Sequence, residues 1–158
     1  MLKYTVGFIK QENEILMLNR HYSPNMGKWN GVGGKFEKNE TPSECMIREV
    51  YEETGIIVSK EDLNYKGVVT WESENGNSGM YVFIIEFFQK DQYTTPKKTE
   101  EGILSWKNIE WICDFNNSGV VSHIPYFLPF TLQNDQICEH RFLFTNNTVQ
   151  KYERFYLS

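Results

Sequence analysis

The sequence predicts a mixed α/β (α+β) domain in which helices cover a mixed β-sheet. Two observations favour this class. Short runs rich in Val, Ile, Phe and Tyr alternate with turn-forming residues, as β-strands do. One segment, residues 41–55, carries both a start and a stop signal for a helix. The length of 158 residues suits one such domain, and we expect residues 1–158 to form a single unit.

The first strands are expected near the N-terminus. YTVGFI (4–9) and EILMLNR (14–20) are apolar runs joined by the polar turn KQENE. The glycine-rich stretch that follows, residues 23–40, should be mostly loop with room for a short strand.

A helix should begin directly after this loop. Thr41 and Glu44 form a T-x-x-E capping box, and Pro42 suits the first helical position. Thr54-Gly55 predicts the end of the helix, because glycine readily adopts the left-handed conformation found after a helix.

The remaining elements follow from apolar runs and turn residues. We expect strands at 65–72 and 80–88 joined by a turn at 73–79, a short strand and its continuation over 103–112, a proline-interrupted helix over 120–132, and a hairpin over 139–156 turning at Asn146-Asn147.

Composition narrows the class of protein. The net charge of −5 argues against nucleic-acid partners and acidic membranes, which need a basic face. No apolar run approaches the roughly 20 residues of a membrane helix. The three cysteines lack a C-x-x-C pair, which argues against a disulfide framework or a zinc site and predicts a cytoplasmic protein. The oligomeric state stays open.

Gly33-Gly34-Lys35 suggests a phosphate-binding loop, but two known glycine fingerprints fail. A Walker A loop would need glycine where Trp29 stands, and Ser or Thr where Phe36 stands. A Rossmann loop would also need glycine in place of Phe36.

The expected helix carries an acidic face. Glu49, Glu52 and Glu53 lie at i, i+3 and i+4, so their carboxylates project from one side and repel one another. The negative end of the helix dipole disfavours them further. A cation should compensate, and Mg²⁺ or Mn²⁺ prefers such oxygen ligands. The alternative is an acidic face that is simply solvated.

A longer pattern favours the metal. From Gly34 to Ile56 the chain reads G-x5-E-x7-R-E-U-x-E-E-x-G-U, where U is apolar. Agreement by chance is on the order of 10⁻⁷ from average residue usage. This pattern is the Nudix box, and the chain resembles the Nudix (MutT-like) hydrolase family. The resemblance implies the Nudix fold, a mixed sheet sandwiched between helices (α/β/α).

The resemblance also implies residue roles. Metal ligands would be Glu49, Glu52, Glu53, the backbone carbonyl of Gly33 and a later glutamate. For the last, Glu100 and Glu101 are both candidates, and we prefer Glu101 from its distance to Trp106.

Catalysis would follow from that metal cluster. Glu49 and Glu53, oriented by Arg48 with support from Glu40, would form the catalytic group. Metal would neutralise the diphosphate while one of the two glutamates takes a proton from the attacking water. Which of them is the base stays open.

The flanking segments resemble the subgroup that hydrolyses oxidised purine nucleoside triphosphates. That resemblance implies five substrate-binding positions: Asn30 reading the purine edge, Thr5 beside the base, Trp71 stacking on it, Arg20 on the phosphates and Lys35 as a helper. Asn30 as a turn residue and Trp71 as a core residue are the alternatives.

One position departs from the subgroup. Where the subgroup has an adjacent acidic pair, this chain has His123-Ile124, and Asp114 is the nearest acid upstream.

We therefore predict a cytoplasmic, Mg²⁺-dependent enzyme that acts on a small-molecule nucleotide. It would convert a nucleoside triphosphate, 8-oxo-dGTP first, into monophosphate and pyrophosphate. Alternatives are another Nudix substrate (ADP-ribose, a dinucleoside polyphosphate or an RNA 5′ end) and a non-catalytic nucleotide sensor.

Overall fold

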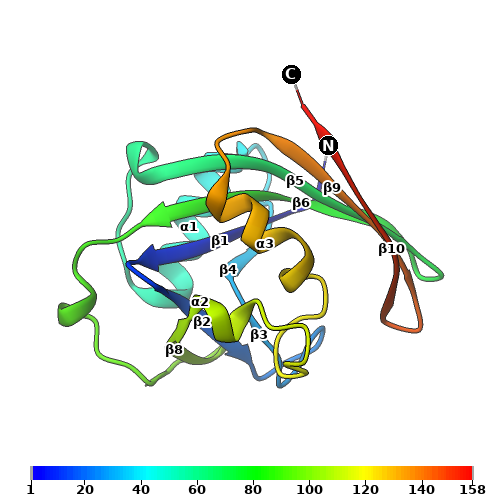
Figure 1. Ribbon diagram of the computed structural model, residues 1–158. Helices are drawn as coiled ribbons and strands as arrows, with labels where there is room; N and C mark the ends of the chain where they lie inside the picture. Colours follow the sequence, from blue (N-terminus) through cyan, green and yellow to red (C-terminus); the bar gives the residue numbers. More distant parts are fainter. Residues whose placement is uncertain (1, 158) are drawn as a thin grey trace.

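The computed structural model describes residues 2–157, apart from the side chain of Lys90, and in that range ten strands form one mixed sheet (Figure 1). The strands are β1 (Tyr4–Gln11), β2 (Glu14–Arg20), β3 (Trp29–Asn30), β4 (Val32–Lys35), β5 (Leu63–Ser73), β6 (Gly76–Glu86), β7 (Lys97–Lys98), β8 (Gly102–Asn108), β9 (Cys138–Thr145) and β10 (Thr148–Tyr156). The helices are α1 (Pro42–Thr54), α2 (Ile109–Ile112) and α3 (Ile124–Gln133), with single 3₁₀ turns η1 (Lys60–Asp62) and η2 (Lys90–Gln92).

The strand order is β10-β9-β5-β6-β1-β2-β8-β7, with β3 on β2 and β4 on β1. Two neighbouring pairs are parallel, β1 with β6 and β5 with β9. The other pairings are antiparallel, which makes the sheet mixed as expected.

Helices lie on both faces of the sheet (Figure 1). Helix α1 packs Met46 and Val50 into one apolar cluster, while α3 packs Phe127 and Leu128 into another. Strand β6 divides its side chains between the two clusters in strict alternation, with Val82 and Ile84 facing α3 while Phe83 and Ile85 face α1. Burial on both faces explains why the central strands read as continuous apolar runs. The predicted α/β/α arrangement is confirmed.

The strongest local signals produce the expected elements. The capping box forms, with the Thr41 hydroxyl accepting from the Glu44 N–H and the Glu44 carboxylate accepting from the Thr41 N–H. Gly55 ends α1 with φ +78°. The C-terminal hairpin turns at Asn146-Asn147, both left-handed at φ +53° and +61°, as a two-residue turn between twisted strands requires.

Four predicted boundaries were wrong. Strand β6 begins at Gly76, because Ser73 pairs with Gly76 and cross-strand pairing continues through residues expected to form a turn. It ends at Glu86, not at residue 88. The segment 103–112 does not continue as a strand, because the Asn108 side chain accepts the Glu110 N–H and starts the short helix α2. The proline-containing helix begins at Ile124 rather than at residue 120, and passes through Pro129.

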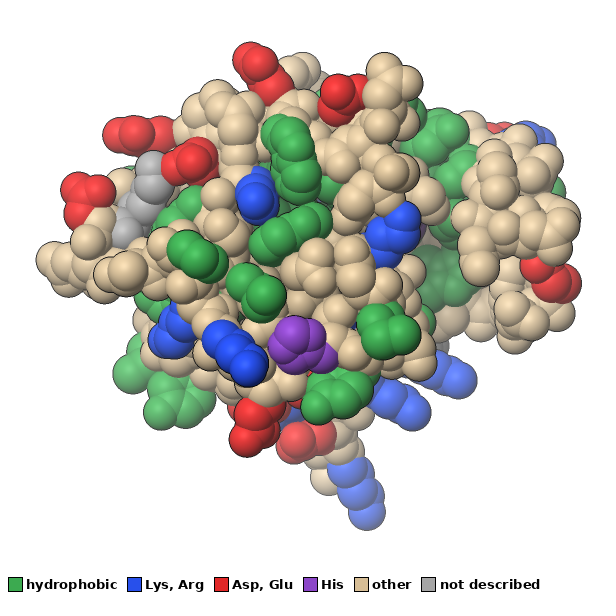
Figure 2. Space-filling view, turned by 90° about the horizontal axis from the view of Figure 1, so that it is seen from below, with side chains coloured by type: hydrophobic (Ala, Val, Ile, Leu, Met, Phe, Trp, Pro, Cys, Tyr) green, Lys and Arg blue, Asp and Glu red, His purple; other side chains and the backbone are tan. Residues whose placement is uncertain are grey.

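No helix within residues 2–157 has the length and apolar character needed to cross a membrane. On the face shown in Figure 2, lysine and arginine side chains are dispersed among hydrophobic and acidic ones. This face therefore presents no continuous basic surface of the kind that binds nucleic acid.

Candidate active site

The loop before α1 is shaped by close backbone approaches. A Cβ atom on Gly33 would lie 2.1 Å from the Thr5 carbonyl oxygen, because β4 pairs with β1 at this point. A Cβ on Gly34 would lie 2.6 Å from the Glu49 carboxylate. Larger residues would therefore push the loop away from the helix. The glycines bring backbone close to carboxylates.

Arg48 gathers the acidic side chains at this end of the molecule. Its guanidinium holds both carboxylate oxygens of Glu40, at 2.6 and 2.8 Å. It also donates to Glu49 at 2.8 Å, to Glu52 at 3.1 Å and to the Lys35 carbonyl at 3.1 Å. Hydrogen bonds to Arg48 lower the pKa of Glu40 to about 2, and those carboxylates raise the pKa of Arg48. Arg48 thus connects three carboxylates of this group through hydrogen bonds.

Glu53 differs from the other acids because it is buried, with 6% of its surface exposed. Its Oε1 accepts the Gly33 N–H at 3.3 Å, while its Oε2 has no partner among the described residues. Burial raises the pKa of Glu53 to about 9, and the neighbouring Glu49 carboxylate and hydrogen bond add to the rise. A smaller contribution to the raised pKa comes from the Glu101 carboxylate.

The donor set suits a hard divalent cation. As they stand, no three Asp, Glu, His or Cys side chains in residues 2–157 converge tightly enough to enclose an ion, since Arg48 draws Glu49 and Glu52 to itself. However, Glu53 presents a buried oxygen without a partner beside a second carboxylate, Glu49. Two carboxylates in that position repel each other unless a proton or a cation lies between them.

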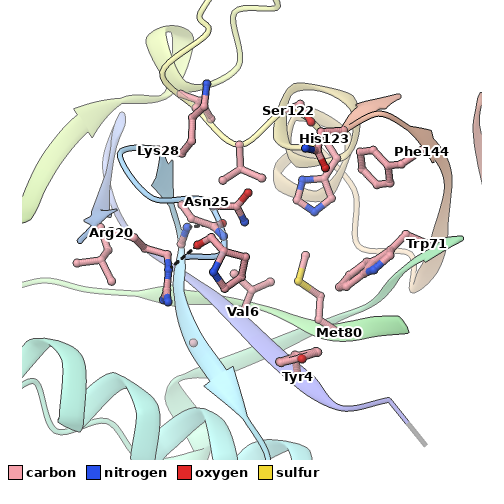
Figure 3. Close-up of a pocket in the computed structure, with 18 of the residues that line it drawn as sticks. Tyr4, Val6, Arg20, Asn25, Lys28, Trp71, Met80, Ser122, His123 and Phe144 are labelled. Carbon is pink, nitrogen blue, oxygen red and sulfur yellow. Dashed lines mark hydrogen bonds between the residues drawn. The ribbon is translucent and has the colours of Figure 1, made fainter. Parts of the chain in front are cut away.

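A cleft of about 1280 Å³ is lined by Glu53 of the acidic group and by His123 and the first turn of α3, and Figure 3 shows part of it. All five predicted substrate-binding residues line it, and so do Gly33 and Glu53 from the predicted metal group. Those five are Thr5, Arg20, Asn30, Lys35 and Trp71. The lining omits Glu49, Glu52, Glu101, Arg48 and Glu40.

Several polar side chains of the lining already form hydrogen bonds or contacts within the protein. Asn30 Oδ1 accepts the Gly31 N–H at 2.8 Å, which leaves the amide Nδ2 as a donor. Arg20 Nε donates to the carbonyl of Pro24 at 2.9 Å. The hydroxyl of Thr5 lies 3.5 Å from Cys45 Sγ.

The far end of the cleft is aromatic. Figure 3 shows Trp71, Met80 and Tyr4 on one side, opposite His123 and Phe144. The ring of His123 lies edge-on to Trp71 at 6.4 Å between centroids. Arg20 and Lys28 lie at the other side of the cavity in the same view.

Sequence reasoning assigned no role to several lining residues. Phe144 and the tip of the β9–β10 hairpin, residues 147–149, come from a segment remote from the box. His123 stood at a position where the resembling subgroup has acids, which was a usable signal. Asp114, the acid considered there, accepts the Asn116 N–H and is not part of the lining.

Comparisons with known proteins agree with this geometry. The family model described as NUDIX domain matches residues 1–116. An uncharacterized Nudix hydrolase, YvcI, of Bacillus subtilis is 28% identical over 139 residues, covering 87% of this chain and 83% of the relative. The oxidized purine nucleoside triphosphate hydrolase of Mus musculus is 27% identical over 149 residues, covering 94% and 91%. The crystal structure of a MutT protein from Bacillus halodurans has the same fold, with a TM-score of 0.78 at 22% identity and coverage of 98% and 97%.

Proposed function

The chain belongs to the Nudix family of hydrolases, which act on phosphoric anhydrides, and from that premise we propose its substrate and its catalytic residues. We propose that the protein converts a nucleoside triphosphate into nucleoside monophosphate and pyrophosphate, with oxidised purine nucleotides such as 8-oxo-dGTP as leading substrates. One observation carries the proposal: a single cleft joins the buried acid Glu53 to an aromatic end containing Trp71. The similarity to the mouse enzyme over 94% of this chain supports it.

The proposal takes residues 1–158 as one domain. Phe144 and the hairpin tip form walls of the same cleft as Glu53, and β9 pairs directly with β5. The C-terminal segment beyond the family match therefore contributes to the same site.

Glu49, Glu52 and Glu53, with the Gly33 carbonyl and Glu101, would hold Mg²⁺ or Mn²⁺. The bound ion would neutralise charge on the diphosphate and favour ionisation of water. Glu53 would take that proton with its carboxylate held ionised by the bound cation, because it is the glutamate of this group that lines the cleft. Glu49 is the alternative base, since its carboxylate lies near enough to Glu53 to raise the pKa of that residue.

The aromatic end would hold the base. Trp71 offers a flat surface on which a purine can stack, worth about 1–3 kcal/mol. Asn30 would donate from Nδ2 to the base edge, because its oxygen is already occupied. Arg20 and Lys35 would contact phosphate oxygens, and Thr5 would shape the pocket beside the base.

Hydrolysis of a nucleotide panel with Mg²⁺ tests the proposal. The panel includes 8-oxo-dGTP, the four common dNTPs, ADP-ribose, a dinucleoside tetraphosphate and a capped RNA, with pyrophosphate and phosphate measured separately. We expect pyrophosphate and monophosphate from the triphosphates, fastest from 8-oxo-dGTP. Faster cleavage of ADP-ribose or capped RNA would contradict the substrate proposal. Failure to cleave any compound would favour a non-catalytic nucleotide sensor.

A further inference from the structure

His123 lines the cleft directly before α3, although only 7% of its surface is exposed. Figure 3 shows its ring facing the cavity between Trp71 and Phe144. The rings of Phe127 and Phe142 pack edge-on against it, each at 5.4 Å between centroids. The imidazole is therefore a polar group set in an aromatic wall.

The ring has no polar partner in the described part of the chain. Its Nδ1 is sealed from solvent and accepts or donates no hydrogen bond. Leaving such a group unpaired is unfavourable, because nothing replaces the hydrogen bond to water that it loses on burial. The other buried histidine, His140, is satisfied, because its Nδ1 lies 2.7 Å from the Tyr152 hydroxyl and outside the cleft lining. Neither nitrogen of His123 has a partner in residues 2–157, and only Nδ1 is sealed, so Nε2 is free to bond a ligand in the cleft.

The chemistry of the ring can be specified further. Burial lowers the pKa of His123 to about 4, and aromatic rings rather than charged groups face it, so the imidazole is neutral at pH 7. An unpaired buried N–H is rarer in proteins than an unpaired buried lone pair. The sealed Nδ1 therefore carries the lone pair, and Nε2, the nitrogen that is not sealed, carries the hydrogen.

We propose that His123 determines base specificity by donating a hydrogen bond from Nε2 to a carbonyl oxygen of a purine held against Trp71. This inference rests on the proposed function, because it deepens the choice of substrate at the same site. With Asn30 Nδ2, the cleft then presents two donors to the base. Purines with 6-oxo or 8-oxo groups supply matching acceptors, whereas the 6-amino group of adenine supplies a donor. The site should select oxopurines.

Four proteins and four triphosphates test this assignment. The proteins are wild type, His123→Phe, His123→Gln and the control His140→Phe, which removes a buried imidazole outside the cleft. The substrates are dGTP, 8-oxo-dGTP, dATP and abasic deoxyribose triphosphate. His123→Phe should lower kcat/KM for both oxopurines roughly tenfold, through KM, because one hydrogen bond is lost. Hydrolysis of dATP and the abasic compound should change less than about twofold. His123→Gln keeps a donor and should recover part of the loss.

The outcomes separate this inference from the proposed function. An equal loss on the abasic compound, or an unchanged ratio of oxopurine to dATP turnover, would overturn the role of His123 while leaving triphosphate hydrolysis intact. A changed ratio in His140→Phe would also overturn it, by showing that any aromatic repacking alters selectivity. Inactivity of the wild type on all four compounds would instead overturn the proposed function.

Discussion

The two ends of the cleft are built in different ways. At the acidic end, Arg48 ties Glu40, Glu49 and Glu52 into one network, and those residues all lie within the segment that matches the family model. The aromatic end combines Trp71 from β5 with His123 and Phe144, which lie beyond residue 116 and outside that match. The acidic end is charged, and its side chains hydrogen-bond to one another. The aromatic end is apolar and contains an imidazole without a hydrogen-bond partner in the described residues.

This difference suggests that the acidic end carries the reaction and the aromatic end carries the selectivity among bases. The acidic end depends on a spacing that only one helix and its preceding loop can provide, so changes there should affect every substrate. The aromatic end is assembled from strands and loops far apart in the sequence. Changes there should redistribute preference among bases while leaving the reaction itself intact.

The largest expected effect comes from Glu53→Gln. The substitution keeps the shape of the side chain and removes its negative charge and its capacity to take a proton. We expect kcat to fall by at least about 10²-fold on every nucleotide. Steady-state kinetics measure this, with the exposed Glu61→Gln as the matched control. Near-normal turnover, or a loss confined to one base, would remove Glu53 from the reaction.

The same residue predicts how metal-free stability depends on pH. The pKa of Glu53 is about 9 in the folded protein and about 4.5 when unfolded, so folding takes up a proton between these values. Because the folded state binds more protons, this contribution to stability falls as pH rises through that window. We expect Glu53→Gln to raise the melting temperature in EDTA at pH 9 by at least about 4 °C relative to wild type, and by less at pH 7.

The comparison uses pH 7 to 9 because the buried histidines do not interfere there. Burial lowers the pKa of His123 and His140 to about 4, so both are neutral in the folded protein above pH 7, and largely so when unfolded. Added Mg²⁺ should reduce the difference in melting temperature between Glu53→Gln and wild type, because a cation favours the ionised carboxylate of the wild type. A gap that stays constant from pH 7 to 9 would contradict the raised pKa.

A smaller effect is expected from Arg48→Lys. Lysine keeps the positive charge but cannot hold Glu40 with two parallel hydrogen bonds while reaching Glu49 and Glu52. Groups that orient metal ligands typically change activity by about 10–100-fold when mutated. We expect the activity of Arg48→Lys to fall roughly tenfold on all nucleotides. We also expect its rate to depend less strongly on Mg²⁺. Arg141→Lys, in an exposed pair with Glu139, serves as the control. A base-selective loss would contradict a shared acidic end.

More of the acidic end than of the aromatic end could be predicted from the sequence. The spacing of the box could be recognised in the sequence, because Gly34, Glu40 and Arg48 lie at short sequence separation, while the roles of its residues came from the family resemblance. The buried, unpaired Oε2 of Glu53 could not be predicted from the sequence, since its burial depends on packing against β4 and β1. His123 illustrates the same limit: its partnerless ring results from aromatic neighbours on three separate elements.

Strand boundaries failed for a related physical reason. Residues 76–79 contain glycine, asparagine and serine, which individually favour a turn. In the fold they pair with residues 70–73 of β5, and backbone hydrogen bonding across the hairpin outweighs the local preference. Such pairing is visible only when both strands are in place.

The smallest expected effect is at Asn30, which also lines the cleft. The Gly31 N–H fixes its oxygen, so Asn30→Asp keeps that contact and replaces the donor Nδ2 with an acceptor. We expect a roughly five- to tenfold loss of kcat/KM on oxopurine triphosphates, a smaller loss or a gain on dATP, and little change on the abasic triphosphate. Asn30→Ala should lose the same preference without reversing it. Equal losses on all substrates in both variants would make Asn30 a turn residue that supports the glycine loop. In that case the base would be read from the aromatic end alone.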